Sequence, residues 1–140
     1  MKIQIKDGVS FECDNDFLLR SALEQGLGFP YECASGSCGN CRFELLSGDL
    51  DYPGGQPDIL SEKDLERNRH LACQCVPKTD LEIKVRLFDQ YEPVHNPSRF
   101  TGKLVAIEEV THDISEFRFE TDSRQIFETG QFALIDVPGV

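Results

Sequence analysis

The stretch YECASGSCGNCRFELLSG, residues 31–48, brings three cysteines and two glycines together: Cys33, Cys38 and Cys41, with Gly36 and Gly39 between them. Glycine tolerates backbone conformations that other residues avoid, so a loop with two glycines can fold closely around a compact group. Outside small disulfide-stapled secreted scaffolds, clustered thiols are typical of a metal site. The stretch therefore predicts a metal-binding loop that leads into a strand, CRFELLSG.

The composition of the whole chain is that of a globular protein with one ordinary domain or two small ones. Of its 140 residues, 39% are hydrophobic and 28% are charged. The first residues, MKIQIKDGVSFECD, lack the apolar segment of a signal peptide, and no apolar run reaches the length of a membrane span. We therefore expect a cytoplasmic protein without a membrane span.

The chain is acidic, with a formal net charge of -11 that is spread along its length. Binding to nucleic acid needs a basic patch, and the sequence shows none, so we do not expect a nucleic-acid partner. The acidity favours solubility, and electrostatic docking onto a basic protein partner is the alternative.

The first part of the chain opens with a predicted hairpin and a short helix. KIQIK and VSFEC alternate apolar and polar residues on either side of a DG turn, which is typical of a β-hairpin. DNDFLLRSALEQGLG then predicts a helix with its N-cap at Asp14, Asn15 or Asp16 and its end at Gly26 and Gly28.

Further elements follow the cysteine-rich loop. After the strand CRFELLSG, SEKDLERN predicts a second short helix that is capped by Ser61 together with Asp64. HLACQCV and LEIKVRL predict two more strands. This order is an α+β pattern, and a mixed sheet packed across one main helix explains it best.

The last part of the chain reads as a separate, all-β region. Two prolines and the absence of periodicity in residues 91–99 predict a linker between a first domain, residues 1–90, and a second region, residues 100–140. GKLVAIEEVT, ISEFRFETD and GQFALIDVPG read as three strands with polar turns between them. Three strands without a closing partner predict the first part of an antiparallel β-barrel that is cut short.

The spacing of the cysteines predicts an iron–sulfur cluster. Cys33-x4-Cys38-x2-Cys41 is the plant-type 2Fe-2S pattern, in which a distant fourth cysteine completes the ligand set. Cys73 and Cys75 both lie in the predicted strand HLACQCV, two residues apart and on one face if that strand is regular, so spacing alone leaves the fourth ligand open between them.

Other roles for the cysteines and histidines are less favoured by the pattern. Zinc sites usually present two Cys-x2-Cys knuckles, and only one occurs here. A Rieske centre needs two histidine ligands, and His70, His95 and His112 show no Cys-x-His spacing. Cys13, at the end of the predicted hairpin, is expected to be an ordinary buried thiol.

Three segments, PYECASGSCGNCRFELLSG, SEKDLERNRHLACQCVPKTDLEIKV and FETGQFALIDVP, resemble the NADH-dependent reductase components of bacterial multicomponent oxygenases, most closely those of toluene and xylene monooxygenases. The resemblance implies a β-grasp ferredoxin domain with a 2Fe-2S cluster, followed by the first part of a ferredoxin-reductase-type FAD-binding barrel. In that family the first cysteine of the LACQ segment is the ligand. The implied ligand set is therefore Cys33, Cys38, Cys41 and Cys73, with Gly36 and Gly39 in the cluster loop.

For the complete family members, the resemblance implies that FAD takes hydride from NADH and that electrons pass singly through the cluster to an oxygenase or hydroxylase, a Rieske protein or another acceptor. GQF at residues 130–132 matches the strand that leads into the flavin site. The next family motif, Arg-x-Tyr-Ser, would follow Val140, and the sequence contains no glycine-rich dinucleotide turn. We expect FAD binding and NADH oxidation only together with the remaining FAD and NAD domains of the same reductase.

Three functions remain open from the sequence. The first is one-electron transfer as the ferredoxin portion of an oxygenase reductase. The second is a stand-alone ferredoxin electron carrier. The third is a zinc-stabilised interaction module, which a colourless metal site would reveal.

Overall fold

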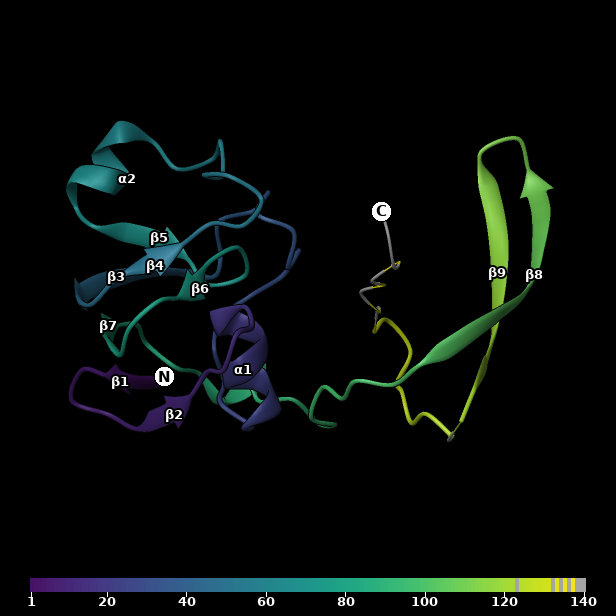
Figure 1. Ribbon diagram of the computed structural model, residues 1–140, viewed down its shortest axis with the longest axis horizontal. Coiled ribbons are helices and arrows are strands. Elements are labelled where there is room, and N and C mark those ends of the chain that lie inside the picture. Colours follow the sequence, from purple (N-terminus) through teal and green to yellow (C-terminus); the bar gives the residue numbers. More distant parts are fainter. Residues whose placement is uncertain (123, 132, 134, 136, 138–140) are drawn as a thin grey trace. The chain divides into compact units, whose positions relative to one another are not determined.

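The computed structural model describes residues 1–122, 124–131, 133, 135 and 137, and the chain forms two compact units, Met1–Pro97 and Ser98–Val140 (Figure 1). The division between the units lies inside the segment that was predicted as a linker, residues 91–99. Among the described residues, no helix is long and apolar enough to cross a membrane.

The first unit is built on a five-stranded mixed sheet with the strand order β2-β1-β7-β3-β5. β1 pairs with β7 in parallel, and the other neighbouring strands are antiparallel. A separate two-stranded sheet joins β4 to β6. The strands of the unit are β1 (Lys2–Ile5), β2 (Ser10–Glu12), β3 (Arg42–Ser47), β4 (Leu50–Asp51), β5 (Arg69–Leu71), β6 (Val76–Pro77) and β7 (Leu81–Lys84). The α+β class and the mixed sheet predicted from the sequence are confirmed.

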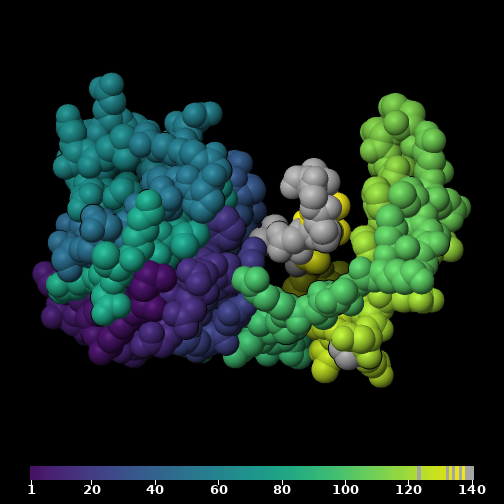
Figure 2. Space-filling view, viewed as in Figure 1, coloured from purple at the N-terminus to yellow at the C-terminus, as the bar shows by residue number. Residues whose placement is uncertain are grey.

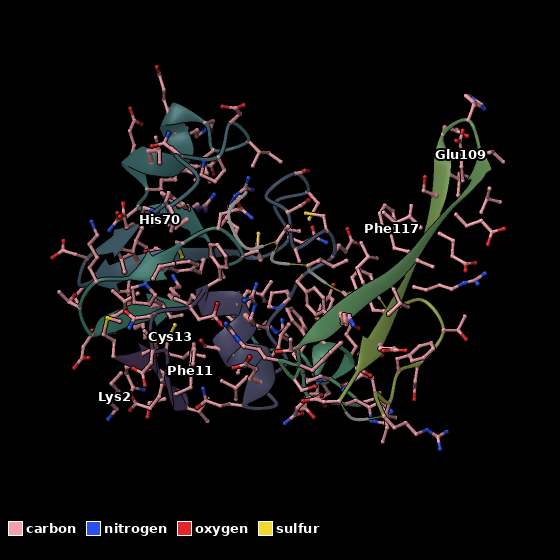
Figure 3. All side chains as sticks on the ribbon, turned by 45° about the vertical axis from the view of Figure 1, so that its right-hand side comes forward. Lys2, Phe11, Cys13, His70, Glu109 and Phe117 are labelled. Carbon is pink, nitrogen blue, oxygen red and sulfur yellow. The ribbon has the colours of Figure 1, made fainter. Side chains whose placement is uncertain are left out.

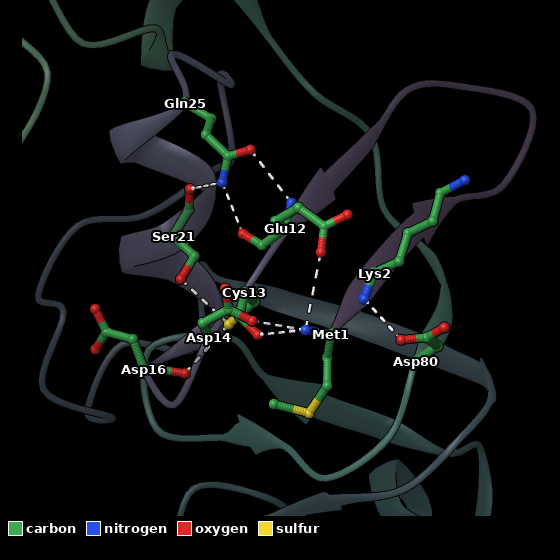
Figure 4. A network of polar contacts seen from close by, with 9 residues as sticks. All are labelled: Met1, Lys2, Glu12, Cys13, Asp14, Asp16, Ser21, Gln25 and Asp80. Atoms are coloured by element: carbon green, nitrogen blue, oxygen red, sulfur yellow. Dashed lines mark hydrogen bonds and ion pairs between the residues drawn. The ribbon is translucent and has the colours of Figure 1, made fainter.

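The N-terminal hairpin forms as predicted and is tied to the rest of the unit by polar contacts (Figure 4). The terminal amine of Met1 lies 2.8 Å from Asp14 Oδ1, and Lys2 N–H donates to Asp80 Oδ1 at 2.7 Å. Gln25, which follows the first helix, donates to the Glu12 carbonyl at 2.7 Å. These contacts fasten the hairpin to the helix and to the chain just before β7.

Helix α1 (Leu18–Glu24) ends just before Gly26, whose φ is +76°, as predicted, but its predicted N-cap is wrong. The N-cap residue is Phe17, which makes no side-chain capping bond. The first helical N–H groups instead find backbone partners far along the chain: Leu18 N–H donates to the Cys75 carbonyl at 3.1 Å, and Leu19 N–H to the Ala72 carbonyl at 2.9 Å. A tertiary contact thus satisfies N–H groups that a capping side chain would otherwise bind.

Helix α2 (Glu62–Glu66) has the predicted capping box, in which Ser61 and Asp64 exchange side-chain and backbone hydrogen bonds. The predicted strand HLACQCV, by contrast, is wrong as a continuous element. β5 ends at Leu71, residues 72–74 form a turn, and β6 begins at Val76. Cys73 therefore lies on a turn, and the period-2 argument that placed Cys75 on its face does not hold.

The core of the first unit lies between α1 and the sheet. Buried side chains from the helix pack with the inward residues of the strands, and Phe11 and Cys13 of the hairpin lie among them (Figure 3). In the space-filling view, purple residues of the N-terminal hairpin lie beside teal residues from much later in the chain, as the parallel pairing of β1 and β7 requires (Figure 2). The largest fully buried side chains are Ile3, Leu18, Phe29, Leu71 and Ile83.

The chain after β7 also contacts this unit. Phe88 N–H donates to the Gly28 carbonyl at 2.9 Å, and a short 3-10 helix, η1 (Asp89–Tyr91), follows. Asn96 Nδ2 donates to the Glu24 carbonyl at 3.0 Å. Hydrogen bonds at Phe88, just before the predicted linker, and at Asn96, within it, therefore hold this segment to the rest of the first unit.

The second unit contains a long antiparallel hairpin, β8 (Gly102–Thr111) and β9 (Ile114–Thr121), which confirms the first two predicted strands of this region. The third predicted strand, GQFALIDVPG, includes residues 132, 134, 136, 138 and 139, which lie outside the described residues. The described residues of this unit do not form a closed barrel.

Candidate metal centre

The loop between α1 and β3 has the backbone shape that its glycines allow. Gly36 and Gly39 have φ angles of +86° and +78°, in the left-handed region that costs other residues strain. A β-carbon at Gly36 would lie 3.0 Å from Gln74 Cγ, so the loop approaches the turn after β5 closely at this point. The two segments that carry the predicted ligands are therefore in contact.

The backbone of the loop points N–H groups at its own sulfur atoms. Ser35 N–H and Cys38 N–H each lie 3.4 Å from Cys33 Sγ, and Asn40 N–H lies 3.4 Å from Cys38 Sγ. Successive N–H groups of this kind form a concave site that favours negative charge. The loop is built to stabilise thiolates.

The third and fourth predicted ligands, Cys41 and Cys73, lie next to each other. The thiols of Cys41, just before β3, and Cys73, on the turn after β5, share a hydrogen bond. Gln74 Nε2 lies 3.7 Å from Cys73 Sγ, and the Gly36 backbone also donates to that thiol. Cys73 is thus in contact with the cysteine-rich loop from the opposite side.

The electrostatic environment shifts the pKa values of Cys33, Cys41 and Cys73 in different directions. Desolvation acts to raise the pKa of Cys33, but hydrogen bonds from Ser35 and Cys38 outweigh it and lower that pKa to about 6. The hydrogen bond with Cys41 lowers the pKa of Cys73 to about 7, and the same bond raises the pKa of Cys41. Thiolate is the form that binds metal, so Cys33 and Cys73 are prepared for it near neutral pH.

Cys75 and Cys13 have different surroundings. Both are buried, with exposed fractions of 0% and 1%. Burial raises the pKa of both thiols, and the nearby Cys13 raises that of Cys75 further. Cys13 Sγ accepts a hydrogen bond from Ser21 Oγ at 3.2 Å and donates to the Asp16 carbonyl at 3.3 Å. These two thiols behave as core residues.

His70 and His112 contact groups other than these thiols. His70 Nδ1 lies 2.8 Å from Tyr52 Oη, and its Nε2 lies 3.3 Å from Asn68 Oδ1. Burial lowers the pKa of His70, so the imidazole is neutral at pH 7 and packs between Tyr52 and Phe43. His112 is exposed beside Asp113.

The four predicted ligands form two neighbouring pairs of thiols, Cys33 with Cys38 and Cys41 with Cys73. Two adjacent pairs suit a binuclear cluster, in which each iron takes two cysteine ligands. Sequence reasoning missed the neighbours that support them, above all Gln74 and Ser35, because a glutamine after a cysteine and a serine in a loop carry no recognisable signal.

Comparison with known proteins agrees with this site. Residues 3–78 match the family model of the 2Fe-2S iron-sulfur cluster binding domain. The chain is 48% identical over 127 residues to the ferredoxin–NAD(P)(+) reductase CarAd of Metapseudomonas resinovorans, covering 88% of this chain and 39% of that protein. It is 34% identical over 122 residues to the xylene/toluene monooxygenase electron transfer component XylA of Pseudomonas putida, covering 85% and 33%.

A solved structure, the ferredoxin reductase in carbazole 1,9a-dioxygenase, superposes with a TM-score of 0.90 at 42% identity and covers 99% of this chain and 45% of that one. The chain thus spans less than half the length of these relatives. Its resemblance to oxygenase reductase components is confirmed. Through residues 3–78, the chain belongs to the family of 2Fe-2S iron–sulfur cluster binding domains.

Proposed function

We propose that the first unit is a one-electron carrier whose 2Fe-2S cluster is held by Cys33, Cys38, Cys41 and Cys73. The observation that carries the proposal is the grouping of these thiols into two pairs beneath inward-pointing N–H groups. In a 2Fe-2S cluster with four cysteine ligands, each iron takes two of them, so two adjacent thiol pairs are the donor set that it needs.

The residues around the pairs have separate tasks. The N–H groups of Ser35, Cys38 and Asn40 offset the negative charge that gathers on thiolate sulfur. Gln74 donates to the Cys73 carbonyl at 3.0 Å and approaches Cys73 Sγ, which fixes the turn. When bound, the cluster supplies transfer of one electron at a time. Cys38, the exposed member of the set, marks the side from which a partner can approach.

The wider context of the proposal comes from the relatives. One is the ferredoxin–NAD(+) reductase component of an alkene monooxygenase system in Xanthobacter autotrophicus, 37% identical over 140 residues. We infer that this chain serves the same kind of system in the cytoplasm and passes electrons to an oxygenase or hydroxylase, directly or through a Rieske protein. Electrons would reach it from FAD and NAD domains of the same reductase.

The second unit fits the start of the flavin domain in this proposal. Apolar side chains of the β8–β9 hairpin are exposed, among them Ile107 and Phe117 at 60% and 55%. Further strands of an antiparallel barrel would cover such side chains. The similar structure titled as the FAD apo form of the carbazole dioxygenase reductase covers 86% of this chain, with a TM-score of 0.81.

The first experiment is an absorption spectrum with iron, sulfide and zinc analysis on protein purified without oxygen, before and after dithionite. The proposal requires a brown protein with about two irons and two sulfides per chain that bleaches on reduction. A colourless protein with one zinc would favour the interaction module instead. The length of the gene distinguishes the other two functions. A gene that continues into flavin and nicotinamide regions favours the reductase, and one that does not favours a stand-alone ferredoxin.

A further inference from the structure

A groove rich in cations lies on the first unit of this acidic protein. It has a volume of about 680 Å³ and is lined by five cationic side chains: Lys6, Arg42, Arg69, Lys84 and Arg86. Two carboxylates, Asp7 and Glu44, lie among them, so the lining side chains carry a net charge of +3. Residues 1–97 as a whole contain 10 Lys and Arg against 17 Asp and Glu, a net charge of -7. Half of the unit's cations therefore surround one groove.

The carboxylates near the groove neutralise it only in part. Lys84 Nζ lies 3.7 Å from Glu44 Oε2, while Arg42 and Arg69 share Asp64 at 3.8 and 3.7 Å. These are loose, partly exposed pairs of the kind that exchange partners at little cost.

Lys6 and Arg86 stand apart from these pairs. Both are exposed, and neither has a carboxylate partner among the described residues. The Arg86 guanidinium lies 4.9 Å from the ring centroid of Phe88, which also lines the groove. An anionic group can therefore pair with Lys6 and Arg86 without breaking an ion pair.

The groove is joined to the candidate cluster site by Arg42. This residue directly follows the ligand Cys41, and its guanidinium nitrogen Nη2 would lie 3.2 Å from a β-carbon at Gly39 of the cluster loop. A group that binds in the groove beside Arg42 thus lies next to the cysteine-rich loop. A partner that binds at this position would therefore be close to the cluster, from which it takes electrons.

We propose that this groove docks an acidic face of the protein that accepts electrons from the cluster, an inference that rests on the proposed function. The charge of the groove is complementary to a local acidic patch, and arginine with aromatic residues is a common composition for protein interfaces. An extended polyanion is a poor fit, because the surface beyond the groove is acidic. The net charge of the chain alone would favour a basic partner, whereas the charge of this groove favours an acidic one.

The test uses the protein with its cluster, reduced by dithionite, and two oxidised haem proteins as probes: acidic cytochrome b5 and basic cytochrome c. Stopped-flow absorbance at low salt gives the rate of electron transfer to each. The variant Lys6→Glu/Arg86→Glu reverses the two unpaired cations of the groove. Its matched control, Lys63→Glu/Arg67→Glu, makes the same charge change on exposed residues at helix α2, outside the groove.

The proposal predicts that the groove variant reduces cytochrome b5 at least about threefold more slowly than the wild type, with a smaller change in the control. It also predicts no loss of rate toward cytochrome c. A groove variant as fast as the wild type, or an equal loss in the control, would overturn the docking site while leaving the electron carrier intact. A wild-type protein that holds a cluster but reduces neither probe would overturn the proposed function itself.

Discussion

Gln74 packs against Gly36 where the two segments that carry the proposed ligands meet, and a β-carbon added to the glycine would lie 3.0 Å from Gln74 Cγ. The same glycine has a φ of +86° and donates its backbone N–H to Cys73. One position therefore sets the loop conformation, its distance from the turn and one of the hydrogen bonds to a proposed ligand.

The variant Gly36→Ala tests this relationship. An alanine there would pay about 1–2 kcal/mol for its left-handed backbone and would also press on Gln74. We expect iron content to fall to less than about half of two irons per chain, measured by metal analysis and the visible spectrum.

Gly55→Ala is the matched control, since Gly55 has a similar φ of +84° and no atom would lie within 4 Å of its β-carbon. It should keep its full iron content. If the two variants lost iron equally, backbone strain alone would explain the result and close packing on Gln74 would have no special role.

The choice between Cys73 and Cys75 gives a second prediction. Cys73→Ser should lose the cluster, because this thiol faces Cys41 and the loop. Cys75→Ala should keep the cluster and lose about 1 kcal/mol of unfolding free energy, because it removes only a buried sulfur from the core. Iron analysis and thermal unfolding of both variants check this, and loss of iron in Cys75→Ala alone would reverse the assignment.

Much of the fold could be predicted because its determinants are local. The hairpin follows from period-2 alternation around the DG turn, and α2 follows from the pairing of Ser61 with Asp64. The helix α1 follows from its apolar stripe, but its start does not. The carbonyls of Ala72 and Cys75 act as its caps, and no pattern near residue 16 reveals partners more than fifty residues away.

The same distant contact explains why HLACQCV was wrongly predicted as one strand and why spacing alone left the fourth ligand open. In HLACQCV the apolar alternation indicates one strand, yet the chain turns at residues 72–74. The turn brings the Cys73 thiol to Cys41 and points two carbonyls at α1. Cysteine spacing predicted which residue types gather there, whereas the local backbone was decided by tertiary hydrogen bonds.

The thiols of the cluster-free protein should differ in reactivity with pH. Since the pKa of Cys33 is lowered to about 6, its thiolate fraction rises through pH 6, well below the usual range near 8.5. Burial raises the pKa of Cys75, so it should stay unmodified across this range. Iodoacetamide labelling between pH 5 and 9, read by peptide mass spectrometry, measures both; labelling of Cys33 that begins only above pH 8 would contradict the hydrogen-bonding role of the loop.

The contact between Tyr52 and His70 supports the turn from its outer side. Leu71 N–H donates to Tyr52 Oη at 3.4 Å, which leaves the hydroxyl proton for His70 Nδ1 at 2.8 Å. Tyr52→Phe removes both bonds and leaves a half-buried imidazole nitrogen without its partner, so we expect a loss of about 1 kcal/mol in unfolding free energy.

Tyr91→Phe makes the same chemical change where the described residues offer the hydroxyl no hydrogen bond, and it should unfold at the wild-type denaturant midpoint. Both variants should keep their iron, because His70 lies outside the proposed ligand set; a loss of iron in Tyr52→Phe would instead show that this pair positions Cys73 through β5.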